Sequence, residues 1–270
     1  MSHVTRTALW LSFFGLILAA WAMMYMMSMS MGLDLIGRPS EMAAKMAMLD
    51  PRMSMDMPQG MPMARFGPLF AMWAIMMAAM MLPTMVPTLR SYEDLMVSAD
   101  GTRAGWLGVI AGYAIVWIAF AALIAGVQLA LLYGGVIDML GMAKSRWVTA
   151  ALLIAVGLFQ FTRAKEICHG VCHSPMMYFL GNWKTGTLGG LRMGLGLGVF
   201  CVGCCWGFMA LGFVGGVMSL LWMGAATLFM VLEKLPQIGH VITKPMGFAL
   251  ILAGLAVIAS PLSVELEAWL

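Results

Sequence analysis

The sequence predicts an all-α fold, a polytopic bundle of about seven transmembrane helices. Hydrophobic residues make up 62% of the 270-residue chain and charged residues only 10%, whereas a soluble domain carries about 25% charged residues. The mean hydropathy is +0.93. Apolar runs long enough to cross about 30 Å of hydrocarbon recur along the chain. Backbone polar groups in lipid must be satisfied internally, so these runs are expected to be helices.

The same composition excludes several classes of protein. The net charge of +3 is small and no dense Lys/Arg stripe occurs, which argues against nucleic acid as a partner. The sequence contains no nucleotide-binding loop, GxSxG elbow or HExxH helix. We therefore expect the lipid bilayer as a partner and assign no catalytic residue; an enzymatic role is not favoured.

Three parts of the chain differ in composition. Residues 1–31 are expected to form a first transmembrane helix, 32–65 a methionine-rich extracytoplasmic loop, and 66–270 the bundle that carries the Cys and His clusters. Arg6, an apolar run and Ala20-Trp21-Ala22 also resemble a cleaved signal peptide. The apolar run continues well past that site, which favours a retained helix.

The expected spans follow from the length of each apolar run. One run of about 44 residues is too long for a single span and is divided at Gly215-Gly216. The seven spans are 8–31, 66–89, 105–134, 147–163, 191–213, 217–232 and 246–261. Nine Lys and Arg residues then lie on the side of the N-terminus and six on the other side. Because Lys and Arg favour the cytoplasm, the N-terminus is expected inside and the C-terminus outside.

Methionine is concentrated in the first third of the chain, where 22 of 32 lie within residues 1–96. The polar segment 53–63 contains Met53, Met55, Met57, Met61 and Met63. Thioether sulfur is a soft, neutral ligand that selects Cu(I) and needs no deprotonation. A polar loop has no hydrophobic core into which these side chains would have to pack. They therefore predict capture of Cu(I) outside the cytoplasm, where thiols risk oxidation.

Methionines of the second span have a different pattern, because they form stripes at helical spacing. The stripes are Met72, Met76 and Met80, and Met77, Met81 and Met85. Such stripes are more typical of helix packing than of metal ligation. Pro83 and Pro87 should kink or end this helix and open a cavity near Met81 and Met85.

All five cysteines lie between residues 168 and 205, which indicates a local site rather than a disulfide scaffold. The first cluster is Cys168-His169-Gly-Val-Cys172-His173. At about 100° per residue its four ligands fit an arc of about 140° on one helical face. They would form half of a metal cage.

The second cluster, Cys201-Val-Gly-Cys204-Cys205, places three sulfurs on one helical face near the middle of the membrane. Free cysteine often packs as a small hydrophobe, but two clusters together favour metal binding or redox chemistry. Both zinc and Cu(I) accept such ligands, and the methionine supply favours copper. The spacing of the first cluster does not match C-x-x-C-H, which argues against attached haem. Glu166 and Glu233 are candidates for supporting roles around the metal.

The chain resembles a bacterial family of predicted metal-binding integral membrane proteins, over roughly residues 66–260. The residues that carry the resemblance are Met-Met-Ala-Ala-Met-Met-Leu-Pro-Thr-Met at 76–85, Lys165-x-x-Cys168-x-x-x-Cys172-x-Ser174-Pro175, Arg192-Met193-Gly194, Cys201-Val-Gly-Cys204-Cys205-Trp206, Met209, Gly216-x-Met218, Trp222-Met223 and Glu233-Lys234. The C-x-G-C-C-W element is its most specific part. The resemblance implies a metal protein of the bacterial inner membrane, with copper as a candidate metal, and supplies no reaction.

Three functions remain open from the sequence. The first is Cu(I) handling, with capture by loop methionines and holding or relay by the Cys/His cluster, for delivery to a copper enzyme, storage or resistance. The second is a membrane thiol–disulfide oxidoreductase. The third is a structural or assembly subunit of a larger membrane complex, since glycine-rich faces such as Gly194 and Gly198 allow other helices to approach closely.

Overall fold

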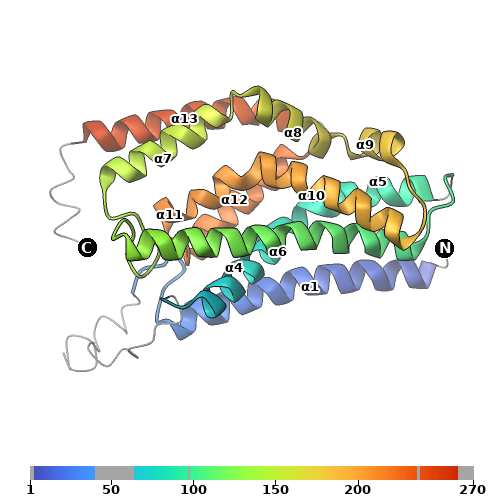
Figure 1. Ribbon diagram of the computed structural model, residues 1–270, viewed down its shortest axis with the longest axis horizontal. Coiled ribbons are helices and arrows are strands. Elements are labelled where there is room, and N and C mark those ends of the chain that lie inside the picture. Colours follow the sequence, from blue (N-terminus) through green and yellow to red (C-terminus); the bar gives the residue numbers. More distant parts are fainter. Residues whose placement is uncertain (1–2, 40–63, 97, 236–237, 261–270) are drawn as a thin grey trace.

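The computed structural model describes residues 3–39, 64–96, 98–235 and 238–260. Over these ranges the chain forms an elongated bundle of helices with no strand, which confirms the predicted all-α class (Figure 1). The start of α1 and the end of α13 lie at opposite ends of the bundle (Figure 1). Which end faces the cytoplasm stays a prediction.

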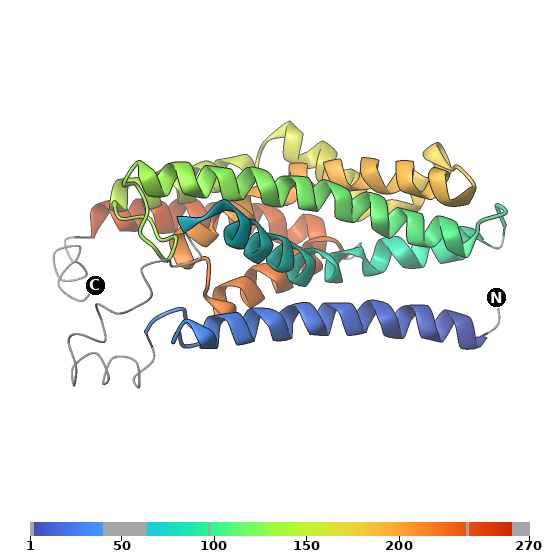
Figure 2. The same ribbon diagram turned by 60° about the horizontal axis from the view of Figure 1, so that its bottom comes forward.

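Five helical segments are long and apolar enough to cross a membrane. They are α1 (His3–Ser30), α4 (Phe66–Met81) continued by α5 (Val86–Met96), α6 (Arg103–Tyr133), α10 (Gly186–Ala210) continued by α11 (Gly212–Gly215), and α13 (Gly239–Ala259). Helix α1 runs along one side of the bundle beside α4 (Figure 2). Near the beginning of α1, Arg6 forms an ion pair with Glu93 of α5, with 3.1 Å between Nη2 and Oε2.

The number of spans is smaller than the sequence predicts, although all seven predicted segments contain helix. Helices α7 (Arg146–Phe159) and α8 (Arg163–His173) are bent by 64° at their junction and count as a sixth span only if taken together. Helix α12 (Leu220–Glu233) has 14 residues and is only about 21 Å long. It is therefore shorter than the hydrocarbon core, and the length of the helices supports five or six spans.

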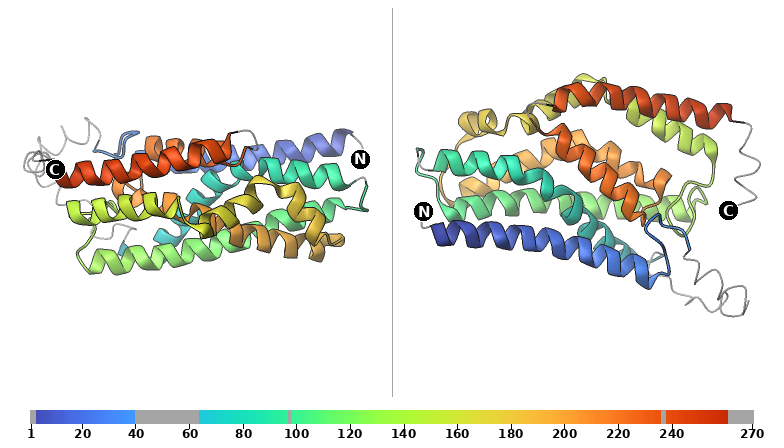
Figure 3. Two further views of the ribbon diagram at one scale, coloured as in Figure 1. Left: turned by 90° about the horizontal axis from the view of Figure 1, so that it is seen from above. Right: turned by 180° about the vertical axis from the view of Figure 1, so that it is seen from behind.

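Three helices stop near the middle of the bundle. Helix α4 ends at Met81 and is followed by the 3-10 turn η2 (Pro83–Met85), as the prolines predict. Helix α7 ends at Phe159, and α12 ends at Glu233, from where α13 runs back toward the end at which α12 began (Figure 3). Such breaks are tolerated at membrane depth only where protein buries them.

Two further features position the site. A cavity of about 300 Å³ lies between α1, α4 and α6; Met81 lines it together with Tyr113, whereas Met85, where the sequence also predicts a cavity, does not. Helices α6 and α10 approach closely, because a Cβ added at Gly194 would collide with the carbonyl of Val109. This approach brings the cysteine face of α10 into the centre of the bundle.

Candidate metal centre

The cysteines of α10 lie together in the centre of the bundle. Cys201, Cys204 and Cys205 are each 2% exposed or less. The Sγ of Cys204 lies 3.2 Å from that of Cys205, and the Sγ of Cys201 lies 4.0 Å from that of Cys205. One helical turn of α10 therefore presents three sulfurs to the interior.

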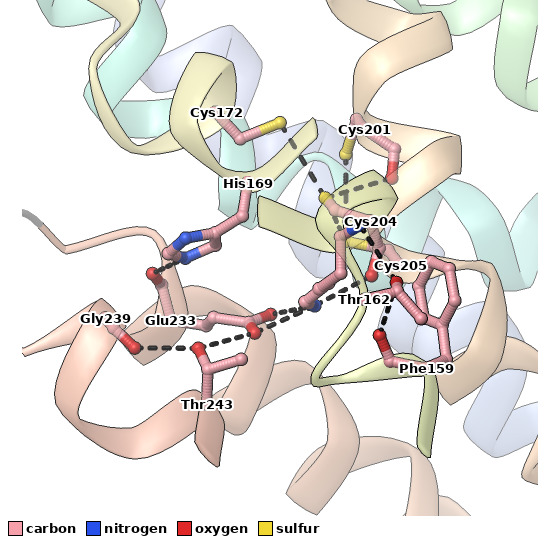
Figure 4. Close-up of polar contacts among 11 residues, drawn as sticks. Phe159, Thr162, His169, Cys172, Cys201, Cys204, Cys205, Glu233, Gly239 and Thr243 are labelled. Carbon is pink, nitrogen blue, oxygen red and sulfur yellow. Dashed lines mark hydrogen bonds and ion pairs between the residues drawn. The ribbon is translucent and has the colours of Figure 1, made fainter. Parts of the chain in front are cut away.

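A fourth sulfur reaches this group from α8. The Sγ of Cys172 lies 3.8 Å from the Sγ of Cys204 (Figure 4). The Sγ atoms of Cys172, Cys201 and Cys204 all lie within 4.8 Å of one another. We call these three residues the three-thiol cluster. Three sulfurs bound to one ion at about 2.3 Å are about 4 Å apart in a plane, so the spacing fits a single ion.

A buried ion pair holds α8 against α10 beside the cluster. The Lys165 ammonium lies 2.8 Å from Oε1 of Glu233 and donates to the carbonyl of Cys204 at 2.8 Å. Both ionic side chains are only 1% exposed. Thr243 of α13 donates a further hydrogen bond to Oε1 of Glu233. One network thus joins the ends of α8, α12 and α13 to the middle of α10.

Of the two glutamates predicted to support the metal, only Glu233 lies at the site. Glu166 is exposed in the first turn of α8. The side chain of Glu233 binds Lys165 rather than a cysteine. Its contribution is to neutralise the buried ammonium and to fix the end of α12, and a lone buried charge would be costly.

The remaining members of the Cys/His motif have other surroundings. Cys168 is partly exposed and packs against α10 at Gly203, where an added Cβ would lie 2.6 Å from its Sγ. His169 Nε2 makes a hydrogen bond of 2.8 Å with the carbonyl oxygen of Glu233 (Figure 4). The ring of His173 lies 5.3 Å from that of His169. Both imidazoles therefore lie toward the junction of α12 and α13 rather than in the three-thiol cluster.

Lys234 and Tyr113 contact Cys201, and Thr84 contacts both of them; the sequence pattern assigns none of the three a role at the site. Lys234 donates to the Sγ of Cys201 at 3.0 Å and to the hydroxyl of Thr84 at 2.8 Å. The hydroxyl of Tyr113 lies 3.0 Å from the same Sγ and 3.2 Å from the hydroxyl of Thr84. Lys234 ends an apolar segment and Thr84 follows a proline within one, which is the available signal for these two residues; Tyr113 lies within an apolar run and has no such signal. The ammonium offsets negative charge on a buried thiolate.

The predicted loop ligands Met53, Met55, Met57, Met61 and Met63 lie outside the described residues. The capture of Cu(I) by these side chains therefore stays a prediction. Within the described ranges, the candidate centre contains thiols and no histidine or carboxylate ligand. Both Cu(I) and zinc accept sulfur ligands of this kind.

The fold and the site together define a helical, membrane-type protein with a buried, sulfur-rich centre. The chain belongs to the PpoB2 copper chaperone family, whose model matches residues 70–257. That range contains the whole three-thiol cluster and excludes segment 53–63. A search of curated proteins and a search of solved structures each found no significant match. The predicted metal-binding, copper-handling class is thus supported.

Proposed function

We propose that the three-thiol cluster holds one Cu(I) ion within the membrane for transfer to a copper-requiring partner. The observation that carries the proposal is the convergence of three buried Sγ atoms, from two separate motifs, within 4.8 Å. Thiolates select Cu(I). The copper chaperone family of the chain supports transfer rather than permanent storage.

Lysine ammonium groups beside the cluster offset part of its charge. The Lys165–Glu233 pair is neutral as a whole. The ammonium of Lys234 and one Cu(I) ion together offset two thiolates, so one negative charge remains when all three cysteines bind the ion as thiolates. A single remaining charge costs far less than three uncompensated thiolates in a medium of low dielectric constant.

The experiment is a measurement of copper bound to the purified full chain. The protein is loaded with Cu(I) without oxygen, free copper is removed, and copper and zinc are measured per chain. We expect about one tightly held Cu(I) that excess zinc does not displace. The variant Cys201→Ser/Cys204→Ser should lose that ion. Equal copper in the wild type and this variant would overturn the proposal.

The proposal also covers the capture of Cu(I) and the orientation of the chain in the membrane. Segment 53–63 would collect Cu(I) outside the cytoplasm, in the bacterial inner membrane with the N-terminus inside. An impermeant thiol reagent tests the orientation: Asp138→Cys should react from outside intact spheroplasts and Ser98→Cys should not, since they lie at opposite ends of α6. The reverse result would invert the direction of capture.

A thiol–disulfide oxidoreductase is the second candidate, because the Sγ atoms of Cys172 and Cys204 lie only 3.8 Å apart. A disulfide between them would connect α8 to α10. It would also remove two of the three proposed ligands. Alkylation of the cysteines with a reagent that shifts the gel mobility separates the two functions. The alkylation of a catalytic pair should change with the redox state of the membrane. The alkylation of a copper site should fall only when copper is bound.

A further inference from the structure

A second group of soft ligands lies beside the three-thiol cluster. Four methionine side chains from α4, α10 and α12 line one small cavity, which we call the methionine cavity. They are Met76, Met80, Met209 and Met223, each 3% exposed or less. The other residues around it are Phe208, Gly212, Val217, Trp222 and Ala226. The lining is apolar except for one polar side-chain atom, the indole Nε1 of Trp222, which is buried without a hydrogen-bond partner among the described residues.

The size and the lining of the methionine cavity suit a single unhydrated ion. Its volume is about 10 Å³, room for the centre of one water-sized sphere. A water molecule needs at least two polar partners, and the lining side chains offer only one, the indole Nε1–H of Trp222. Thioether sulfur is soft and adaptable, and it selects Cu(I). The rings of Phe208 and Trp222 can add cation–π attraction.

The cavity lies between the three-thiol cluster and one end of the bundle. On α10, Met209 follows Cys205 by four residues, which is about 6 Å toward α11. On α4, Met80 directly precedes Met81, whose carbonyl accepts hydrogen bonds from the hydroxyls of Thr84 and Tyr113. An ion in the cavity is thus one helical turn from the residues that surround Cys201.

We propose that Met76, Met80, Met209 and Met223 form a second Cu(I) site, through which the ion passes between this end of the bundle and the three-thiol cluster. The inference rests on the proposed function of the thiols. Four neutral thioethers leave the positive charge of the ion uncompensated, whereas thiolates offset it. The methionine site should therefore bind more weakly, as a site of passage must.

The test reads the methionine site directly and independently of the thiols. The full chain is labelled with 13C-methyl methionine, prepared as Cys201→Ser/Cys204→Ser, and titrated with Cu(I), which is diamagnetic. We expect the methyl resonances that disappear in Met209→Leu and Met223→Leu to be among those that shift. Unchanged resonances for these residues would overturn the inference, whatever the thiols bind.

A second readout follows transfer in the chain that keeps its thiols. The variant Met209→Leu/Met223→Leu should load the three-thiol cluster about tenfold more slowly or worse, with its final affinity unchanged. The matched control is Met72→Leu/Met230→Leu, since both methionines are buried and line no part of this cavity. Such swaps conserve volume and are among the best tolerated changes in a packed core. Equal loading by both pairs would contradict passage through the cavity. Failure of the proposed function would give a different result, namely copper binding that Cys201→Ser/Cys204→Ser leaves unchanged.

Discussion

Cys168 and Cys172 lie one turn apart on α8, yet they have different surroundings. Cys172 is 5% exposed and its Sγ lies 3.8 Å from that of Cys204. Cys168 is partly exposed and packs against the backbone of α10 at Gly203. The motif places both sulfurs on one face, but the packing of α10 selects only one of them. A ligand set is therefore defined by how two helices meet, and not by spacing within one helix.

The largest expected effect comes from the ion pair that sets this packing. Lys165→Met leaves Glu233 buried without its cation, in a place where both side chains are 1% exposed. The loss of one partner of a buried pair costs about 3–5 kcal/mol. Thermal unfolding of the purified protein should show it. The double variant Lys165→Met/Glu233→Met should recover much of that stability, and no recovery would contradict the role of the pair.

The next effect separates the two cysteines of α8. Cys172→Ser replaces a soft ligand of the three-thiol cluster with a hard hydroxyl. We expect the affinity for Cu(I) to fall about 100-fold, roughly 2.7 kcal/mol. Competition with a chromogenic Cu(I) chelator measures it. An affinity equal to that of the wild type would remove Cys172 from the site.

A smaller effect is expected at Lys234, which contacts the Sγ of Cys201 without being a ligand. Lys234→Gln keeps a donor and removes the charge that offsets a thiolate. The affinity for Cu(I) should fall about 10-fold, within the range for groups that support metal ligands. The same chelator assay applies. Lys234→Arg retains the charge and should retain most of the affinity, and equal losses in both variants would point to packing instead.

The smallest effect is expected at Cys168. Its sulfur lies against Gly203 and outside the three-thiol cluster. Cys168→Ser should change the affinity for Cu(I) less than about threefold. Substitutions that remove no ligand and no buried contact of a site usually have effects within about 0.5 kcal/mol. A loss as large as that of Cys172→Ser would show that both cysteines bind the metal.

The sequence predicts the fold class and selects the cysteines as candidate metal ligands, because both inferences depend on local properties. Composition and apolar length identify membrane helices, and unusual Cys spacing marks a site. Contacts between distant segments were not predictable in this way. Lys234 and Thr84 are 150 residues apart in the chain and meet only because α4 and α12 both stop at mid-bundle.

The span count and the histidines show the same limit. The sequence predicts a span over 217–232, but α12 has only 14 residues and ends at Glu233. His169 shares the motif of Cys172, yet its ring bonds to the carbonyl of Glu233. In both cases tertiary packing, rather than the local pattern, decides the outcome.

X-ray absorption at the copper edge, on the Cu(I)-loaded full chain, tests the central claim most directly. A centre made by Cys172, Cys201 and Cys204 predicts a first shell of sulfur alone, at about 2.3 Å by analogy with other metal–thiolate bonds. The sulfur count should fall in Cys172→Ser and stay constant in Cys168→Ser. A shell containing imidazole nitrogen, or one that is identical in both variants, would contradict the three-thiol centre.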